Sequence, residues 1–152
     1  SYTWQTSAQS VEAVSSSAND ASAGTGARTV KIWGLDENYV EVDETVTLTG
    51  TTPVALAGTY IRIFRARVLT AGSSGYNAGT ITIRVASAGA TLAQLAYSSD
   101  FAFGFCQTNM DRETGPAGKT AYLLSWTGRA SNSATSGFGH MVLLVREFGG
   151  VF

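Results

Sequence analysis

The sequence predicts an all-β protein, a single-domain two-sheet sandwich or jelly roll of about eight strands. Three observations lead to this prediction. Alternation of apolar and polar residues with a period of two dominates the chain, and no long segment has the period of an amphipathic helix. Segments rich in glycine, serine and asparagine separate the apolar runs. The length of 152 residues suits one domain that needs neither metal nor disulfide to fold.

The first 26 residues predict an extended arm that lies outside this domain. Val11 and Val14 can pair briefly, but residues 15–24 are small and polar, as in loops. The chain is therefore expected to have three parts: an N-terminal arm at 1–26, a β-sandwich domain at 27–148 and a C-terminal tail at 149–152.

Alternation or dense apolar character marks the expected strands: 28–34, 39–48, 60–69, 80–85, 90–97, 101–105, 119–127 and 140–148. The first two form a β-hairpin across the polar run at 36–38. Residues 60–69 are the longest strand, with arginines on both faces. Residues 90–97 fit a strand or a short helical turn. The last two runs are nearly continuous in apolar residues, as in strands that are covered on both faces.

The composition favours contact with other protein surfaces. Charged residues make up 14% of the chain, against roughly 25% in typical soluble domains. A weakly charged surface suits protein contacts, although β-sandwiches are often rich in threonine and glycine in any case. The net charge of −1 and the lack of a basic run argue against binding to nucleic acid or to an anionic membrane. No apolar stretch reaches the 18 residues of a membrane span.

Cysteine chemistry gives no candidate site. Cys106 is the only cysteine, so no internal disulfide is possible, which fits assembly in a reducing cytoplasm. A nucleophilic pair would consist of Cys106 and His140, but these are the only residues of their types, so their pairing carries little information. Cys106 follows an aromatic run and is expected to be a small buried apolar residue. Two ligands do not make a zinc site.

The other motifs also predict no catalysis. The segment Gly115–Thr120 ends like a phosphate-binding loop, but Glu113 stands where that loop needs glycine and would repel phosphate. Several carboxylates gather on the first hairpin: Asp36, Glu37, Glu41, Asp43 and Glu44. Their spacing does not match a calcium loop, and no pair stands out for glycoside chemistry. We therefore expect no enzyme activity, no catalytic residue, no cofactor and no metal.

Apolar side chains near the chain ends are the predicted partner contacts. They are Tyr2 and Trp4 on the arm, and Phe148, Val151 and Phe152 around a Gly-Gly pair after the last expected strand. Apolar anchors on chain ends are unfavourable in water unless they dock onto a surface. Docking onto a neighbouring protein and folding back onto the same domain are both compatible with the sequence.

Several segments between residues 17 and 125 carry a resemblance to a known family. They are Ser17–Val30, Gly34–Asp36 with Asn38–Tyr39, Glu44–Thr52, Phe64–Ala66, Leu69–Gly72, Asn77–Gly79 and Pro116–Ala121. In these segments the chain resembles a family of virion structural proteins from aquatic tailed phages. The first block, from Ser17 to Thr52, is distinctive.

This resemblance implies a structural role in the phage particle and brings no catalytic residues. We expect a capsid decoration or cement protein on the capsid exterior, assembled in the host cytoplasm. Its expected partners are the major capsid protein and copies of itself, as a homotrimer. The alternative is a tail- or fibre-associated module that binds host glycan or other tail proteins. Tyr76 and Phe138 are the candidate exposed aromatic residues for that role.

Overall fold

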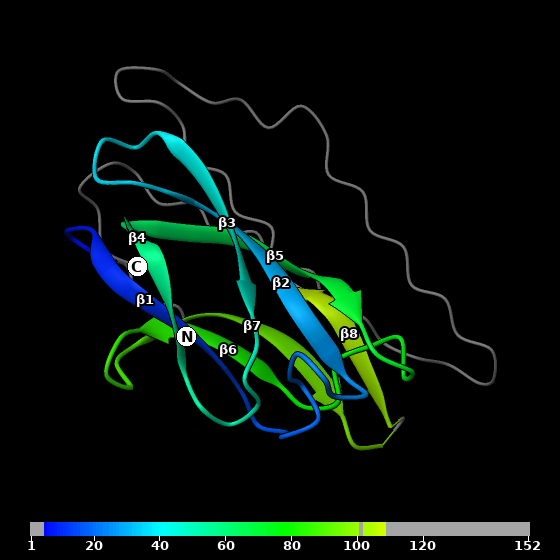
Figure 1. Cartoon of the computed structure of the whole chain (residues 1–152). Helices are drawn as coiled ribbons and strands as arrows, with labels where there is room; N and C mark the ends of the chain where they lie inside the picture. Colours follow the sequence, from blue (N-terminus) through cyan, green and yellow to red (C-terminus); the bar gives the residue numbers. More distant parts are fainter. Residues whose placement is uncertain (1–4, 101, 109–152) are drawn as a thin grey trace, which may run out of the picture. The chain divides into compact units, whose positions relative to one another are not determined.

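A computed structural model of the chain describes residues 5–100 and 102–108. The chain divides into two compact units, Ser1–Pro116 and Ala117–Phe152, and every described residue belongs to the first. The described residues contain eight strands and no helix (Figure 1). The strands are β1 (Gln9–Ser15), β2 (Ala27–Leu35), β3 (Glu41–Thr47), β4 (Val54–Tyr60), β5 (Arg62–Ala71), β6 (Ile81–Val85), β7 (Thr91–Ser98) and β8 (Phe103–Thr108).

All eight strands belong to one antiparallel sheet, in the order β3-β2-β5-β8-β7-β6-β1-β4. A single Cα pairing, Arg67 with Gln107, joins β5 to β8. The two strands at the ends of this order, β3 and β4, approach each other, so the sheet is nearly closed. The all-β class is therefore confirmed. The finer expectation of a two-sheet sandwich or jelly roll is not confirmed, because the strands form one continuous sheet.

Most of the expected strands are present. The runs at 28–34, 39–48, 60–69, 80–85 and 101–105 correspond to β2, β3, β5, β6 and β8. The ambiguous segment at 90–97 is a strand, β7. Two strands, β1 and β4, were not expected. The expected strands at 119–127 and 140–148 lie outside the described residues.

The expectation of an extended arm over residues 1–26 is wrong for residues 9–15, which form β1. This strand pairs with β4 on one side and with β6 on the other. Val11 and Ala13 are fully buried in the core. A short apolar pair within a serine-rich segment therefore suffices for a strand, because two neighbouring strands supply the hydrogen-bond partners and a buried face.

A β-bulge explains why both predicted faces of β5 contain arginine. The register against β2 shifts between the pairs Trp33–Arg65 and Gly34–Ile63. Ile63 and Ala66 are consequently both buried although they are three residues apart, and Arg65 lies on the exposed surface. One extra residue in a strand reverses the facing of all residues beyond it, which a strict period of two cannot predict.

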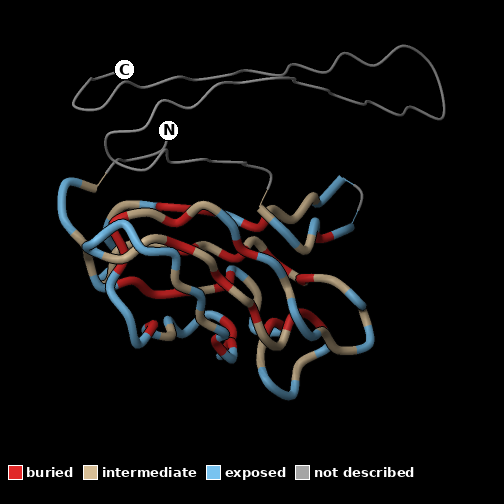
Figure 2. Tube along the Cα trace, turned by 90° about the horizontal axis from the view of Figure 1, so that it is seen from above, coloured by how far each residue is buried: buried red, intermediate tan, exposed pale blue. Residues whose placement is uncertain are grey.

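The core is built from the inward-facing residues of seven strands and of the loop after β3. Its buried members are Val11, Ala13, Ala27, Val30, Ile32, Val46, Leu48, Leu56, Tyr60, Ile63, Ala66, Ile81, Ile83, Leu92, Ala93 and Leu95. Figure 2 shows short buried stretches separated by intermediate and exposed ones along the chain. In strands such as β3 and β8 exposed and less exposed residues alternate. This pattern is that of a sheet with one face on the core and the other in water.

A buried carboxylate fixes the loops at one end of the sheet. Asp20 is fully buried and accepts hydrogen bonds from the Ser15 hydroxyl (2.6 Å) and from the backbone amides of Ala27 (2.7 Å), Ala78 (2.8 Å) and Gly79 (3.0 Å). These donors come from the end of β1, the start of β2 and the loop before β6. Four donors satisfy a carboxylate that would otherwise be very unfavourable inside a protein.

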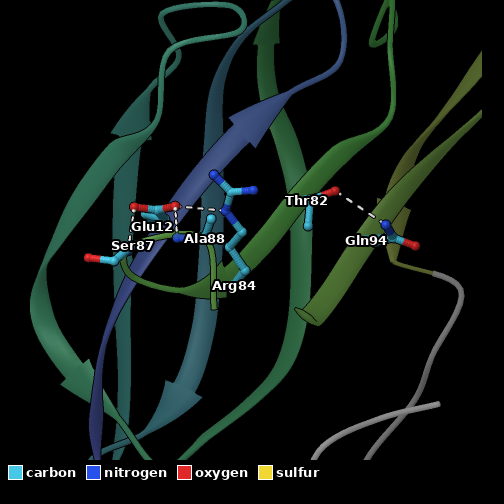
Figure 3. A network of polar contacts seen from close by, with 6 residues as sticks. All are labelled: Glu12, Thr82, Arg84, Ser87, Ala88 and Gln94. Atoms are coloured by element: carbon cyan, nitrogen blue, oxygen red, sulfur yellow. Dashed lines mark hydrogen bonds and ion pairs between the residues drawn. The ribbon is translucent and has the colours of Figure 1, made fainter. Parts of the chain in front are cut away.

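A second carboxylate holds the turn between β6 and β7 (Figure 3). Glu12 on β1 accepts from the Nε of Arg84 at 2.7 Å and from the backbone amides of Ser87 and Ala88 at 3.2 Å each. Ser87 and Ala88 both have a positive φ, which non-glycine residues rarely adopt. Burial raises the pKa of Glu12, but the hydrogen bonds from Arg84 and the two amides outweigh it, so this pKa lies below its usual value.

A third carboxylate connects the two ends of the sheet. Glu44 on β3 accepts from the amides of Ala57 (2.8 and 3.0 Å) and Gly58 (3.3 Å) and from the hydroxyl of Tyr60 (3.2 Å), all on β4. Burial, followed by the charge and hydrogen bond of Glu44, raises the pKa of Tyr60 to about 12. Where β3 and β4 meet, hydrogen bonds to the Glu44 side chain therefore replace the backbone–backbone hydrogen bonds that join the other strands.

Candidate interaction surfaces

The residues that the sequence predicts as partner contacts lie outside the described residues. These are Tyr2, Trp4, Phe148, Val151 and Phe152. The same holds for His140, Phe138 and the segment at 115–120. Candidate surfaces are therefore sought on the described unit, where three groups of side chains stand out.

The first group is an exposed aromatic cluster of Tyr76, Phe103 and Phe105. Tyr76 lies in the loop between β5 and β6, and its ring centroid is 5.1 Å from that of Phe103. Phe103 packs edge-on against Phe105 on the same strand, β8, at 6.0 Å. The two phenylalanines remain 46% and 43% exposed. Such a group on the surface of a soluble protein marks an interaction site more often than a chance exposure.

Gly104 explains why these two phenylalanine rings point outward. This residue is buried between the two phenylalanines, and a Cβ there would overlap the carbonyl of Asn77. The glycine therefore faces inward and contacts the loop, and its two neighbours face outward because side chains alternate along a strand.

From the interior, Asn77 holds the backbone that carries the aromatic cluster in place. Its side chain is fully buried, donates to the carbonyls of Gly79 (2.7 Å) and Ala96 (3.1 Å), and accepts from the amide of Cys106 (2.9 Å). Cys106 has a φ of 61°, a backbone conformation that this hydrogen bond supports. The aromatic cluster thus stands on a rigid base. Preformed surfaces bind more tightly because less conformational freedom is lost.

The second group is a basic face on β2 and β5, made of Lys31, Trp33, Arg65 and Arg67. Cα pairing places Trp33 opposite Arg65 and Lys31 opposite Arg67. The Nζ of Lys31 lies 5.1 Å and the Cζ of Arg65 lies 5.4 Å from the centroid of the half-buried Trp33 ring. Cations at these distances interact favourably with an indole ring.

Among residues 5–100 and 102–108, the charges of the basic face are only partly neutralised. Lys31 forms an ion pair with Asp43 on β3 at 2.9 Å. Arg65 and Arg67 are exposed, and neither has a carboxylate partner among residues 5–100 and 102–108. Within the described part of the chain, the face therefore presents two guanidinium groups without an ion-pair partner beside a tryptophan.

The third group is the acidic turn, a name that covers Glu37, Tyr39 and Val40 between β2 and β3 together with Glu41, the first residue of β3. Asp36 fixes this turn by accepting from the amides of Asn38 (2.8 Å) and Val40 (2.9 Å). Tyr39 and Val40 are 46% and 56% exposed. Glu37 and Glu41 are exposed and form no ion pair within the described part of the chain.

The five carboxylates of the predicted hairpin have different roles. Asp36 caps the turn, Asp43 pairs with Lys31, Glu44 reaches β4, and Glu37 and Glu41 face water. In the described ranges no three histidine, cysteine, aspartate or glutamate side chains form a group that could hold a metal ion. The same ranges contain no helix long and apolar enough to cross a membrane.

Comparisons with protein families, curated proteins and solved structures return no significant match for this chain. The fold and its surfaces therefore define only a broad class. The chain contains an all-β unit with a nearly closed sheet and with aromatic, basic and acidic groups on its exterior.

Sequence reasoning found parts of these surfaces. Tyr76 was named as a candidate exposed aromatic residue, and the structure places it in the aromatic cluster, partly exposed. Phe103 and Phe105 were expected only as part of a strand. Gly104 between them was the available signal, because a glycine inside a strand often marks a close approach of another backbone.

Proposed function

We propose that this protein is a non-enzymatic virion structural protein, a capsid decoration or cement protein on the exterior of a tailed-phage capsid. In this role it binds neighbouring major capsid subunits and associates with copies of itself as a homotrimer. The observation that carries the proposal is the aromatic cluster of Tyr76, Phe103 and Phe105. Its rings are partly exposed to solvent, and hydrogen bonds of the buried Asn77 hold the backbone beneath them in place. The low charge content of 14% and the resemblance to virion proteins support it.

The aromatic cluster is the surface proposed to contact the capsid. Aromatic residues dominate the binding energy of many protein interfaces, and they act best when they are rigidly held. Asn77 and Gly104 hold these rings from the interior, so they need little ordering when a partner covers them. A capsid subunit with an apolar pocket is the partner that this surface fits.

The first experiment counts copies of the protein in purified particles of the phage that encodes it. A capsid role predicts a copy number that is a large fraction of that of the major capsid protein. A few copies per particle would overturn the capsid position in favour of the tail or portal vertex. Absence from the particle would overturn the proposal altogether.

A second experiment tests the binding surface. The variant Phe103→Ser/Phe105→Ser should bind capsids lacking the protein at least roughly thirtyfold more weakly, because an aromatic hot spot contributes about 2 kcal/mol or more. The control Phe103→Tyr/Phe105→Tyr keeps the aromatic area and should retain binding. Equal binding by the serine variant and the wild type would remove the cluster from the interface.

The same cluster supports one alternative, a tail- or fibre-associated module that binds host glycan. Aromatic rings commonly stack on sugar rings, and Tyr76 lies in a loop next to Phe103. A glycan array with the full chain tests this role. A signal that Tyr76→Ala abolishes would favour it over the capsid role, and a blank array would exclude it.

A further inference from the structure

We infer that copies of this chain associate head to tail, with the acidic turn of one copy on the basic face of the next. The turn consists of Glu37, Tyr39, Val40 and Glu41, and the face of Lys31, Trp33, Arg65 and Arg67. The inference rests on the self-association in the proposed function and assigns it a pair of surfaces.

The charges of the two surfaces are complementary. The turn has two exposed carboxylates without an ion-pair partner among the described residues, Glu37 and Glu41. The face has two exposed guanidinium groups in the same situation, Arg65 and Arg67. Complementary charges guide two surfaces into one orientation and disfavour the others.

The apolar parts of the two surfaces also match. Tyr39 and Val40 are among the most exposed large apolar side chains of the described unit, at 46% and 56%. The Trp33 ring centroid lies 5.1 Å from the Nζ of Lys31 and 5.4 Å from the Cζ of Arg65, and part of the indole ring is exposed. Each surface therefore has an apolar centre with charged neighbours, which is the usual arrangement of a protein interface.

The acidic turn of one copy does not satisfy the arginines of the same copy. Glu41 pairs with Leu35 across β2–β3, and Arg65 pairs with Trp33 across β2–β5. Glu41 and Arg65 are thus two strands apart, or roughly 10 Å, and about two residues out of step along the strands. Asp43, which does share a row with Trp33, is already engaged by Lys31.

Two different surfaces that bind each other make a heterologous contact. Such contacts produce a closed ring when the rotation between copies closes, and an open filament when it does not. A trimeric ring is the form that agrees with the proposed decoration role.

The test measures the solution mass of the full chain by sedimentation, with charge-reversal variants. The variants Arg65→Glu/Arg67→Glu and Glu37→Lys/Glu41→Lys should each weaken association by roughly ten- to a hundredfold, because two attractive pairs become repulsive. The fourfold variant that combines them restores opposite charges and should associate again. The control Arg65→Lys/Arg67→Lys keeps the charge and should remain close to the wild type.

A measurement on the unmodified chain complements these variants. Association of the wild type should weaken as salt is raised, since exposed charges are screened. Far-UV circular dichroism and unfolding curves of each variant show whether it has folded.

A wild-type monomer at all concentrations, or double variants with wild-type mass, would overturn the inference. So would a fourfold variant that stays dissociated, because the arginines would then face a different partner. A monomeric chain that still binds capsids through Phe103 and Phe105 would refute this inference and leave the capsid role intact.

Discussion

Replacement of Glu44 with glutamine should loosen the closure of the sheet between β3 and β4. The carboxylate accepts from two amides and one hydroxyl of β4, at 2.8 to 3.3 Å. Glutamine has one acceptor oxygen, and its NH2 group would face a donor, so at least one hydrogen bond to a charged group is lost. Since such a bond contributes about 1.5–3 kcal/mol and this site is partly exposed, we expect a loss of about 2 kcal/mol in the free energy of unfolding.

The titration of Tyr60 gives an independent reading of the same contact. Its pKa is raised to about 12, mainly by burial and then by the charge of Glu44. A raised pKa means that the fold favours the neutral phenol. The contribution of the neutral Tyr60 phenol to the free energy of unfolding is therefore fully present below pH 10 and is lost as the pH rises through about 12. The full shift corresponds to about 2.7 kcal/mol, and screening by water around the half-exposed Glu44 reduces only the part of it that comes from the charge of Glu44.

In Glu44→Gln the pKa of Tyr60 should fall, but not to the usual value, because burial remains. Phenolate absorbance measured against pH gives this pKa, and subtraction of the Tyr60→Phe curve isolates it from the other five tyrosines. Urea unfolding at neutral pH gives the stability difference.

The control is Asp100→Asn, after β7, where the carboxylate is exposed, lies outside both proposed interaction surfaces and makes no ion pair among the described residues. It should unfold like the wild type. The reasoning would be refuted if Glu44→Gln were as stable as this control, or if Tyr60 ionised at the same pH in the wild type and in Glu44→Gln.

Three further substitutions test the interior. Glu12→Gln should lower the free energy of unfolding by about 1–2 kcal/mol at pH 7. Because the pKa of Glu12 is lowered in the fold, this difference should shrink as acid protonates the wild-type carboxyl, and a pH-independent difference in urea unfolding would contradict it. Gly104→Ala should destabilise by about 2 kcal/mol or more in thermal unfolding, since its Cβ overlaps Asn77. The control Gly75→Ala, with open space around it, should cost about 1 kcal/mol for its positive φ alone. Asp20→Asn should cost about 2–4 kcal/mol, because an amide cannot accept from all four donors; a Tm close to that of the wild type would show that the donors find other partners.

Except for β8, whose inward residue is Gly104, the strands that alternation predicted have at least one large apolar residue on their core face. In β2 the inward residues Val30 and Ile32 are enough to indicate a strand. The strands that were missed alternate poorly: β4 buries only Leu56 and Tyr60, four residues apart. In β1 the inward residues are Val11 and Ala13, and between them lies Glu12, whose charge is satisfied only by groups from another part of the chain.

Which side of a strand faces the core was harder to predict than whether the strand exists. The sequence shows that Phe103 and Phe105 share a side of a strand, but not that this side faces water. That outcome depends on Asn77, which lies more than 20 residues away and occupies the interior at Gly104. A long-range polar contact therefore decided the position of the candidate site, and local periodicity contains no information about it.

The closure of the sheet also decides how this unit can bind a partner. An open sheet edge offers unpaired backbone groups to which another chain can add a strand. Here the amides of Ala57 and Gly58 on the end strand β4 are already bonded to Glu44. The opposite end strand, β3, carries carboxylates that repel an added strand, including the exposed Glu41. Adhesion by strand addition is therefore disfavoured at both ends. A partner of this unit has to bind side chains on its faces and turns, so a few aromatic and charged residues should determine both affinity and specificity.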